Sequence, residues 1–339
     1  MTKLGVTVLL AALVLPACIG DLGGGQSGGD TGPASLELVS PAPGAELTRD
    51  TRGSLGELVA PVALAARAGG PIVRVAFVAD DALDLGEAMR PVGADDLALD
   101  SDLDVIGPHT ITAIGYDADG AELARADVDV TVVEPDVADC YGWLDLYGLD
   151  YTRGPNNQGV TEPVTVTVPI NGMSFRYSAN DTPREKFFMD CTLARSLAQA
   201  APMLRARDVI QVVDIGVYNY RCIGGTGTPP DCPRGISQHA YAKAIDIAGF
   251  LTGDGTFYSV LDDWVIDPST EKTCEAGTDN DKDAFLHQTI CELKHANVWN
   301  IVLTPNYNAD HRNHFHVDLT DGADFIRDGD DVDVGPDLH

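Results

Sequence analysis

Apolar and polar residues alternate in several short runs between residues 35 and 135. From 126 to 132, Ala and Val residues alternate with Asp and Thr, and from 73 to 77 Val, Val and Phe occupy every second position. A period of two predicts strands that bury one face. Asp117-Ala118-Asp119-Gly120 lies between two such runs and predicts the turn of a hairpin. About 100 residues of short strands favour an antiparallel β-sandwich.

The pattern changes over residues 139–321, where we expect a second domain. Residues 185–201 follow Thr182-Pro183 with apolar side chains at helical spacing, and residues 284–295 also predict a helix. Strands are predicted at 208–215, 244–247, 299–303 and 314–319. Because these helices and strands are mixed without regular βαβ spacing, the expected class is α+β. The whole chain is therefore predicted to be multidomain.

The N-terminal residues have the pattern of an export signal. Lys3 precedes an apolar run from Leu4 to Leu15, which is typical of a secretory signal and too short to span a membrane. Leu15-Pro16-Ala17-Cys18 then resembles a bacterial lipobox, whose cysteine becomes the lipidated first residue of the mature protein. We expect residues 1–17 to be removed and residues 18–34 to form a lipidated, glycine-rich linker. An ordinary signal peptide with an incidental cysteine is the alternative.

The expected location follows from the residue after Cys18. Ile19 stands where lipoproteins retained in the inner membrane often carry Asp, so the resemblance implies a lipid-anchored protein of the outer membrane of a Gram-negative bacterium, facing the periplasm or the surface. The chain has 52 acidic and 22 basic residues and a net charge of -30. Such a surface repels a phosphate backbone, which argues against nucleic acid as a partner. Residues 322–339 extend this charge as an acidic tail.

Cysteine usage agrees with export. Apart from Cys18, all the cysteines of the chain lie in the second domain, and their even number predicts three disulfides. Sequence alone leaves the pairing open. Cys222 with Cys232 would close a Gly/Pro-rich loop, Cys274 with Cys291 would hold an acidic loop to a helix, and Cys140 with Cys191 follows by elimination. A zinc–thiolate site is the weaker alternative, because no C-x-x-C pair occurs.

Two histidine clusters in the second domain carry residue types that bind metals. The first runs from Ser237 to Asp246 and contains His239, and the second contains His311, His314 and His316. On a strand, His314 and His316 would point to the same face. Two imidazoles and a carboxylate are a common zinc ligand set, and a fourth position left to water is typical of a catalytic site. Surface histidines without a function are the alternative for either cluster alone.

These clusters carry a resemblance to known enzymes. Ser237-x-His239-x-x-Ala242-x-Ala244-x-Asp246 resembles the S-x-H-x-x-G-x-A-x-D motif of the zinc peptidases that include D-alanyl-D-alanine carboxypeptidases and penicillin-insensitive murein endopeptidases. His311-x-x-His314-x-His316 is similar to the second zinc motif of the latter. With Tyr220-Arg221-Cys222 as a further piece, residues 139–321 are most similar to the extensin-like C-terminal family. Ala242 stands where that family has glycine, so a positive φ there would strain the turn.

The resemblance implies a fold for each domain. For residues 139–321 it implies a zinc-peptidase-like α+β domain with a small antiparallel sheet. The order of turns and strands in residues 35–135 looks like the bacterial immunoglobulin-like domains that space or bind at cell surfaces. Fold resemblance alone does not decide function, because one scaffold can serve both catalysis and binding.

Residue by residue, the resemblance also implies roles. His239, Asp246 and His316 would bind one Zn²⁺, and His314 would act as the neighbouring base or transition-state stabiliser. Arg221 would hold a substrate carboxylate or carbonyl, unless it is a structural arginine beside a disulfide. The remaining candidates, which would support the ligands from behind, are His311, Ser237 and Asp318.

Two functions are consistent with these expectations. The first is a membrane-tethered zinc metallopeptidase or amidase that acts on peptidoglycan peptides or their cross-links. The second is a non-catalytic lipoprotein that keeps the zinc-peptidase fold and binds peptidoglycan or another cell-envelope polymer. The complete set of histidines and Asp246 favours the enzyme, whereas Ala242 and the charge of -30 keep the binding function open.

Overall fold

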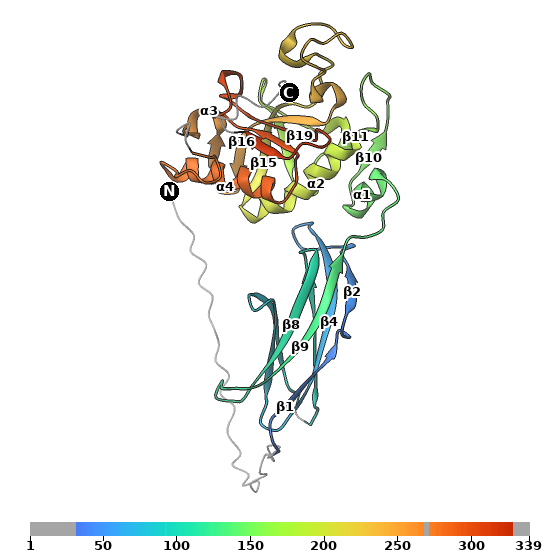
Figure 1. The fold of residues 1–339 in the computed structure, drawn as a ribbon, viewed down its shortest axis with the longest axis vertical. Coiled ribbons are helices and arrows are strands. Elements are labelled where there is room, and N and C mark those ends of the chain that lie inside the picture. Colours follow the sequence, from blue (N-terminus) through green and yellow to red (C-terminus); the bar gives the residue numbers. More distant parts are fainter. Residues whose placement is uncertain (1–31, 92, 268–270, 328–339) are drawn as a thin grey trace, which may run out of the picture.

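The computed structural model describes residues 32–327, except residue 92 and residues 268–270 (Figure 1). The described chain is mostly β structure and has two parts, an N-terminal domain of strands and a C-terminal domain of strands and helices. The predicted signal peptide, Cys18 and the acidic tail beyond Arg327 lie outside the described residues. Over the part of the chain that is described, no helix has the length and apolar character needed to cross a membrane.

Two stacked sheets form the N-terminal domain. The first sheet contains β1 (Ser35–Ser40), β3 (Thr51–Arg52), β4 (Leu58–Gly69) and β7 (Asp96–Leu103). The second contains β2 (Ala45–Thr48), β5 (Arg74–Ala79), β6 (Leu83–Met89), β8 (Gly107–Tyr116) and β9 (Glu122–Val133). Leu64 of β4 and Phe77 of β5 are buried in one core, so both sheets contribute to it.

The alternating pattern produces this sandwich directly. In β9, Val128, Val130 and Val132 are buried while the residues between them are more exposed. The predicted hairpin is present, since β8 and β9 pair antiparallel. At its turn, the Asp117 carboxylate accepts hydrogen bonds from the backbone N–H groups of residues 119 and 121 at 2.9 and 2.8 Å. Gly120 supplies the positive φ of +84° that this turn requires.

A buried histidine pairs with a carboxylate at one end of the sandwich. His109 lies on β8 with 8% of its side chain exposed, and its Nδ1 is 2.6 Å from Asp80 Oδ2. Its Nε2 is 2.7 Å from the carbonyl oxygen of Val105. Burial alone would lower the pKa of His109, but the hydrogen bonds to Asp80 and Val105 raise it above its ordinary value. His109 therefore holds its proton more tightly in the folded state.

The contribution of His109 to stability is expected to fall as the pH rises. Because its folded pKa lies above the unfolded value, this contribution is fully present below about pH 6.5 and is lost as the pH passes the folded pKa. His109→Gln should therefore lower the melting temperature of the chain more at about pH 5.5 than at about pH 8.5. Equal losses at the two pH values, measured by circular dichroism, would contradict this assignment.

In its described part, the C-terminal domain contains an eight-stranded mixed sheet and a three-stranded sheet. The larger sheet has the order β13 (Thr182–Pro183), β12 (Ser174–Tyr177), β15 (Val209–Gly216), β16 (Ala244–Thr252), β19 (Phe315–Asp318), β18 (Ile301–Leu303) and β20 (Phe325–Arg327), with β17 (Phe257–Ser259) beside β16. The smaller sheet contains β10 (Tyr151–Arg153), β11 (Pro163–Thr167) and β14 (Lys186–Asp190).

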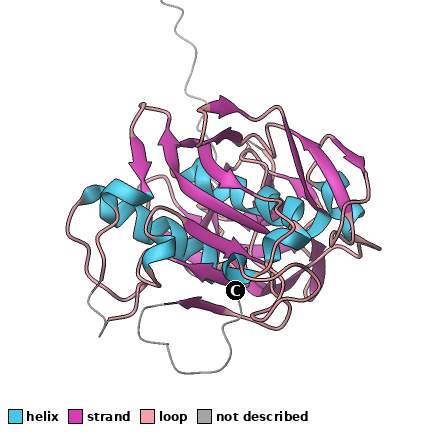
Figure 2. Cartoon of the chain, turned by 90° about the horizontal axis from the view of Figure 1, so that it is seen from above, coloured by secondary structure: helices cyan, strands magenta, loops and turns pink. Residues whose placement is uncertain are grey.

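Helices and strands are mixed in this domain, as the view from above shows (Figure 2). The helices are α1 (Cys140–Leu146), α2 (Cys191–Ala206), α3 (Val260–Asp263) and α4 (Asp281–His295). Short 3₁₀ turns follow β15 and β18, namely η1 (Ile223–Gly225), η2 (Gln238–Tyr241) and η3 (Ala309–His311). Leu197 of α2, Phe250 of β16 and Leu286 of α4 share one buried core, which holds the central sheet in place.

Two expectations for this domain differ from the structure. The helix predicted at 185–201 begins only at Cys191, because Phe187 and Met189 alternate as buried residues of β14 and Asp190 caps the helix by accepting from Thr192 N at 3.1 Å. The sheet is not small and antiparallel, since β12–β15 and β18–β20 pair in parallel. β20 also lies beyond the domain boundary predicted at residue 321. Strands this short show no readable alternation.

Among the described residues three disulfides are present, as predicted, and they join Cys140 to Cys191, Cys222 to Cys232 and Cys274 to Cys291. The first links the starts of α1 and α2. The second closes the loop that follows Arg221, and the third fastens the segment before α4 to that helix. All of them lie in the C-terminal domain.

The two domains also contact each other directly. The side-chain amide of Asn171 donates to the carbonyl oxygens of Gly56 and Ala198 at 2.9 and 2.8 Å. Arg205 Nη1 donates to the Leu55 carbonyl at 2.9 Å. Because Gly56 and Leu55 belong to the N-terminal domain, the turn before β4 is held against α2 and its neighbours.

Candidate metal centre

Two paired strands and a short turn bring three candidate ligands together. Asp246 on β16 is directly opposite His316 on β19 in the antiparallel register. His239 lies on η2, the turn that leads into β16, where the Ser237 hydroxyl caps the turn by accepting from His239 N at 3.3 Å. The ligand atoms of His239, Asp246 and His316 all lie within 4.8 Å of one another. The two sequence clusters therefore form one site.

The donor atoms are spaced as a small cation requires. His239 Nε2 is 3.1 Å from Asp246 Oδ1 and 3.2 Å from His316 Nδ1. His316 Nδ1 is 2.9 Å from the same Asp246 oxygen. Zinc bonds of about 2.0–2.1 Å in a tetrahedron place neighbouring donors about 3.3 Å apart. The three side chains thus fit Zn²⁺ in donor type and in spacing.

Backbone and carboxylate partners fix the orientation of both imidazoles. His239 Nδ1 lies 2.7 Å from the carbonyl of Val217, so this nitrogen donates to the backbone and Nε2 faces Asp246. His316 Nε2 lies 3.0 Å from Asp318 Oδ2, and Asp318 is itself buried. Such partners behind a ligand hold the ring that binds the metal. Asp318 therefore lies where the sequence analysis placed it, behind a ligand.

The same contacts set the charges of the site. Burial would raise the pKa of Asp246, but the charges and hydrogen bonds of His239 and His316 hold it well below its usual range. Burial would likewise lower the pKa of His316, yet its hydrogen bonds to Asp246 and Asp318 raise that pKa to about 9. Asp246 is thus an anion at neutral pH, and a cation that binds here replaces a proton on His316.

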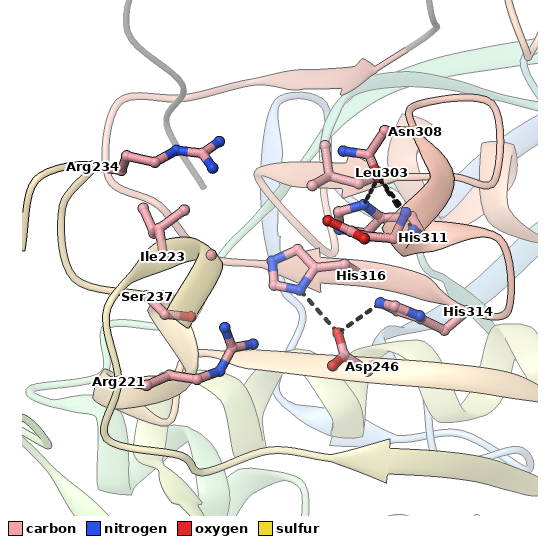
Figure 3. A pocket seen from close by; sticks show the side chains of 12 residues that line it. Arg221, Ile223, Arg234, Ser237, Asp246, Leu303, Asn308, His311, His314 and His316 are labelled. Carbon is pink, nitrogen blue, oxygen red and sulfur yellow. Dashed lines mark hydrogen bonds and ion pairs between the residues drawn. The ribbon is translucent and has the colours of Figure 1, made fainter. Parts of the chain in front are cut away.

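His314 and His311 are not among the three converging ligands. Figure 3 shows both of them beside Asp246 and His316. His314 Nε2 is 3.5 Å from Asp246 Oδ1, while its Nδ1 is 2.9 Å from Asn313 Oδ1. Burial lowers the pKa of His314, which leaves this imidazole neutral and able to accept a proton. Burial also lowers the pKa of His311 to about 3, and its ring centroid lies 5.1 Å from that of His314.

Two cavities open to solvent meet at the ligands. The first has a volume of about 190 Å³, and its lining residues include Arg221, Arg234, Asn308, His311, His314 and His316. The second has a volume of about 860 Å³, and its lining residues include Tyr177, Arg184, Lys186, Phe188, Tyr218 and His239. Asp246 and Arg221 line both. A molecule in either cavity therefore reaches the candidate metal centre.

The remaining predicted residues take distinct places. Arg221 is half-buried, and its guanidinium points towards Asp246 in Figure 3. The Ser237 hydroxyl accepts from the backbone N–H of His239 and so caps η2, which places it behind a ligand. Sequence reasoning missed Arg234 and Asn308, which line the first cavity. Asn308 caps η3 and accepts from His311 Nδ1 at 2.7 Å. Because asparagine is a preferred N-cap residue, its position three residues before His311 was the sequence signal that could have identified it.

Ala242 occupies the strained conformation that its motif position suggested. It has a φ of +53° and a ψ of +30°, it ends η2, and it is fully buried. Its N–H donates to the His239 carbonyl at 3.1 Å, and its own carbonyl accepts from Asp190 N at 3.1 Å. This left-handed backbone conformation costs free energy for a residue with a Cβ atom, whereas glycine adopts it without that steric cost.

Ala242→Gly is expected to change the free energy of unfolding by less than about 1 kcal/mol. Glycine avoids the steric cost of the left-handed backbone, which stabilises the folded variant by about 1–2 kcal/mol. Loss of a buried methyl costs about 0.8 kcal/mol, and the greater freedom of glycine in the unfolded chain costs about 0.5–1 kcal/mol. Urea denaturation of both proteins measures the difference. A loss above about 2 kcal/mol would show that the methyl group is a required part of the core.

Several solved structures are similar to part of this chain. Among solved structures, the fibronectin(III)-like modules of Clostridium thermocellum CbhA are 21% identical, with a TM-score of 0.22, over 30% of this chain and 98% of theirs. CopC from Methylosinus trichosporium OB3b is 17% identical, with a TM-score of 0.22, over 31% of this chain and 100% of its own. The endo-beta-1,4-mannanase from Thermotoga petrophila is 15% identical, with a TM-score of 0.22, over 31% of this chain and 21% of its own.

The family comparison concerns the domain that holds the candidate metal centre. No curated protein matched the sequence. Residues 159–326 match the family model described as extensin-like protein C-terminus, and this segment contains all three candidate ligands as well as His314. The match supports membership of the C-terminal domain in the extensin-like C-terminal family.

Proposed function

We propose that the chain is a zinc-dependent hydrolase, a peptidase or amidase that acts on peptidoglycan peptides or their cross-links. The observation that carries this proposal is the convergence of His239, Asp246 and His316 at 2.9–3.2 Å, with a neutral His314 beside them. The resemblance of both histidine motifs to those of murein-cleaving zinc peptidases supplies the substrate class. The site lies in two solvent-open cavities, which gives a peptide access to it.

The residues of this chain divide the chemistry between them. When bound, zinc supplies a Lewis acid that polarises an amide carbonyl and makes water more acidic. His239, Asp246 and His316 would hold it, and Asp318 would keep the His316 ring in place. His314 takes a proton at Nε2 from the water that attacks the amide carbonyl, because its Nδ1 faces the amide oxygen of Asn313 and burial keeps the ring neutral. It then gives that proton to the leaving amine.

We propose that Arg221 binds the substrate. Its guanidinium lies at the boundary of the two cavities and points towards Asp246 (Figure 3). A planar cation at this place holds a carboxylate or a carbonyl oxygen through paired hydrogen bonds. The neighbouring Cys222–Cys232 disulfide restrains the loop from which Arg221 extends.

The proposed function includes a location. We propose that Cys18 carries a lipid that tethers the chain to the outer membrane, with the glycine-rich linker between the anchor and the sandwich. In this arrangement the N-terminal domain is an immunoglobulin-like spacer. Its contact with the C-terminal domain through Asn171 and Arg205 would keep the metal centre at a fixed place relative to the sandwich.

Cys18→Ser is expected to move the protein from the membrane fraction to the soluble fraction. Stable anchorage requires more than one acyl chain, and the lipidated cysteine is where both would be attached. Detergent partitioning of cells that express the two forms measures the change. Retention of the variant in the detergent phase would contradict the lipid anchor.

A panel of muropeptides tests the proposed function. Purified wild-type protein loaded with one zinc per chain is incubated with cross-linked and uncross-linked muropeptides, and new amines are identified by mass spectrometry. The proposal predicts a new amine from at least one of them. Stoichiometric zinc without any new amine would favour the non-catalytic lipoprotein that binds a cell-envelope polymer.

A further inference from the structure

We propose that Asn306 is a positioning residue for His314, and that it acts through a buried polar network which holds the loop of residues 304–314 in place. The inference rests on the proposed function, in which His314 moves a proton. The network lies outside the candidate metal centre, and none of its members is one of the three ligands. It explains how a histidine that precedes β19 is held beside Asp246.

Asn306 is at the centre of this network. Its Oδ1 accepts from Trp264 Nε1 at 3.2 Å and from Asp267 N at 3.0 Å. Its Nδ2 donates to the Asp267 carboxylate and, at 2.8 Å, to Thr273 Oγ1. All the hydrogen-bonding capacity of the side-chain amide is therefore used. An amide bonded on every side holds its backbone in one position.

The partners of Asn306 are anchored to the helical side of the domain. The Asp267 carboxylate, 6% exposed, lies 3.2 Å from Nε2 of His287 on α4. His287 Nδ1 is 3.1 Å from Asp283 Oδ1, one turn earlier on that helix. The His287 ring stacks on Trp264 with a centroid separation of 3.7 Å. The network thus joins α4 to the loop.

The network also supports the far end of the loop. The edge of Trp264 packs on Phe315, at a centroid separation of 5.2 Å, and Phe315 lies between His314 and His316 in sequence. Arg312 Nη1 donates to the Pro305 carbonyl at 2.5 Å, which closes the loop on itself. Asn308, two residues after Asn306, caps η3 and contacts His311. The loop is therefore bonded to α4 and Trp264 through Asn306 at its start and contacts Trp264 through Phe315 just beyond its end.

A displacement of the loop should move His314 more than it moves the three ligands. His316 is fixed by strand pairing with Asp246 and by Asp318, and His239 is fixed by Val217. His314 has a 3.5 Å approach to Asp246 and a contact with Asn313 in its own loop. A displacement of about 1 Å at a catalytic group can cost about 10²-fold in rate. Loss of Asn306 should therefore affect turnover more than metal binding.

The test compares Asn306→Ala with Asn171→Ala in the full chain. Asn171 is the matched control, because it is likewise an asparagine with several side-chain hydrogen bonds, but it is buried at the domain contact. We expect Asn306→Ala to lower kcat about 10–100-fold while one zinc per chain and KM are retained. Asn171→Ala should lower the melting temperature and leave kcat within about twofold, and Asn306→Gln should recover none of the rate. Equal kcat values for Asn306→Ala and wild type would overturn the proposal.

A second readout does not depend on turnover. In NMR spectra of zinc-loaded protein with ¹⁵N-labelled histidine, Asn306→Ala should broaden or shift the ring signals of His311 and His314 and leave those of His239 and His316 in place. Unchanged signals for all four would overturn the positioning role. Wild-type protein that releases no amine, with the selective shifts still present, would refute the proposed function but not the positioning of the loop.

Discussion

His316→Ala is expected to remove the bound metal and the turnover together. His316 contributes one of three donors that converge within 3.2 Å, and its loss leaves a single imidazole and a carboxylate. Zinc sites in proteins use three or four protein ligands, and two do not hold the ion at ordinary concentrations. The substitution also removes the positive charge that a metal-free His316 shares with Asp246 and Asp318. Elemental analysis after gel filtration should find no zinc.

His295→Ala is the control for this change. His295 is an exposed residue at the end of α4, so its loss removes one imidazole from the chain without touching the site. The control should keep one zinc per chain and full turnover. Zinc retained by His316→Ala at the wild-type level would show that the ion binds elsewhere.

His314→Ala is expected to separate metal binding from catalysis. His314 approaches Asp246 to 3.5 Å but is not one of the three converging donors, so the variant should keep close to one zinc per chain. Its neutral imidazole is the base of the proposed reaction, and removing a general base costs about 10²–10⁴-fold in rate. The measurement is kcat on a muropeptide that the wild-type protein cleaves.

Two results would change the role of His314. Loss of zinc from His314→Ala, to the extent seen in His316→Ala, would make it a ligand instead of a base. Turnover within about twofold of wild type would leave proton transfer to another group. His311 is the neighbouring imidazole, and its pKa of about 3 makes it a weaker base than His314.

The candidate site was more predictable than the fold around it. His239, Asp246 and His316 were predicted from residue type and motif resemblance, because ligands must have particular side chains at particular spacings. The short strands β12, β13 and β20 were not predicted, since two to four residues do not display a period. The start of α2 was misplaced because the alternation in β14 runs directly into the cap at Asp190.

Long-range contacts account for most of what sequence could not provide. Asn306, Asp267 and His287 are far apart in the chain and meet only through the packing of α4 against the loop. The pairing of His109 with Asp80 depends in the same way on two strands that are adjacent only in the folded sheet. A pattern in sequence reports local periodicity, whereas these groups are selected by the tertiary fold.

The most direct test of a zinc-dependent hydrolase is a titration of metal-stripped wild-type protein with zinc, in which amine release from a cross-linked muropeptide is measured at each addition. The structure has one set of three converging donors among the residues it describes, His239, Asp246 and His316. We expect amine release to rise linearly with added zinc and to stop rising at one equivalent per chain. Full zinc loading without amine release, or release that persists in the stripped protein, would contradict it.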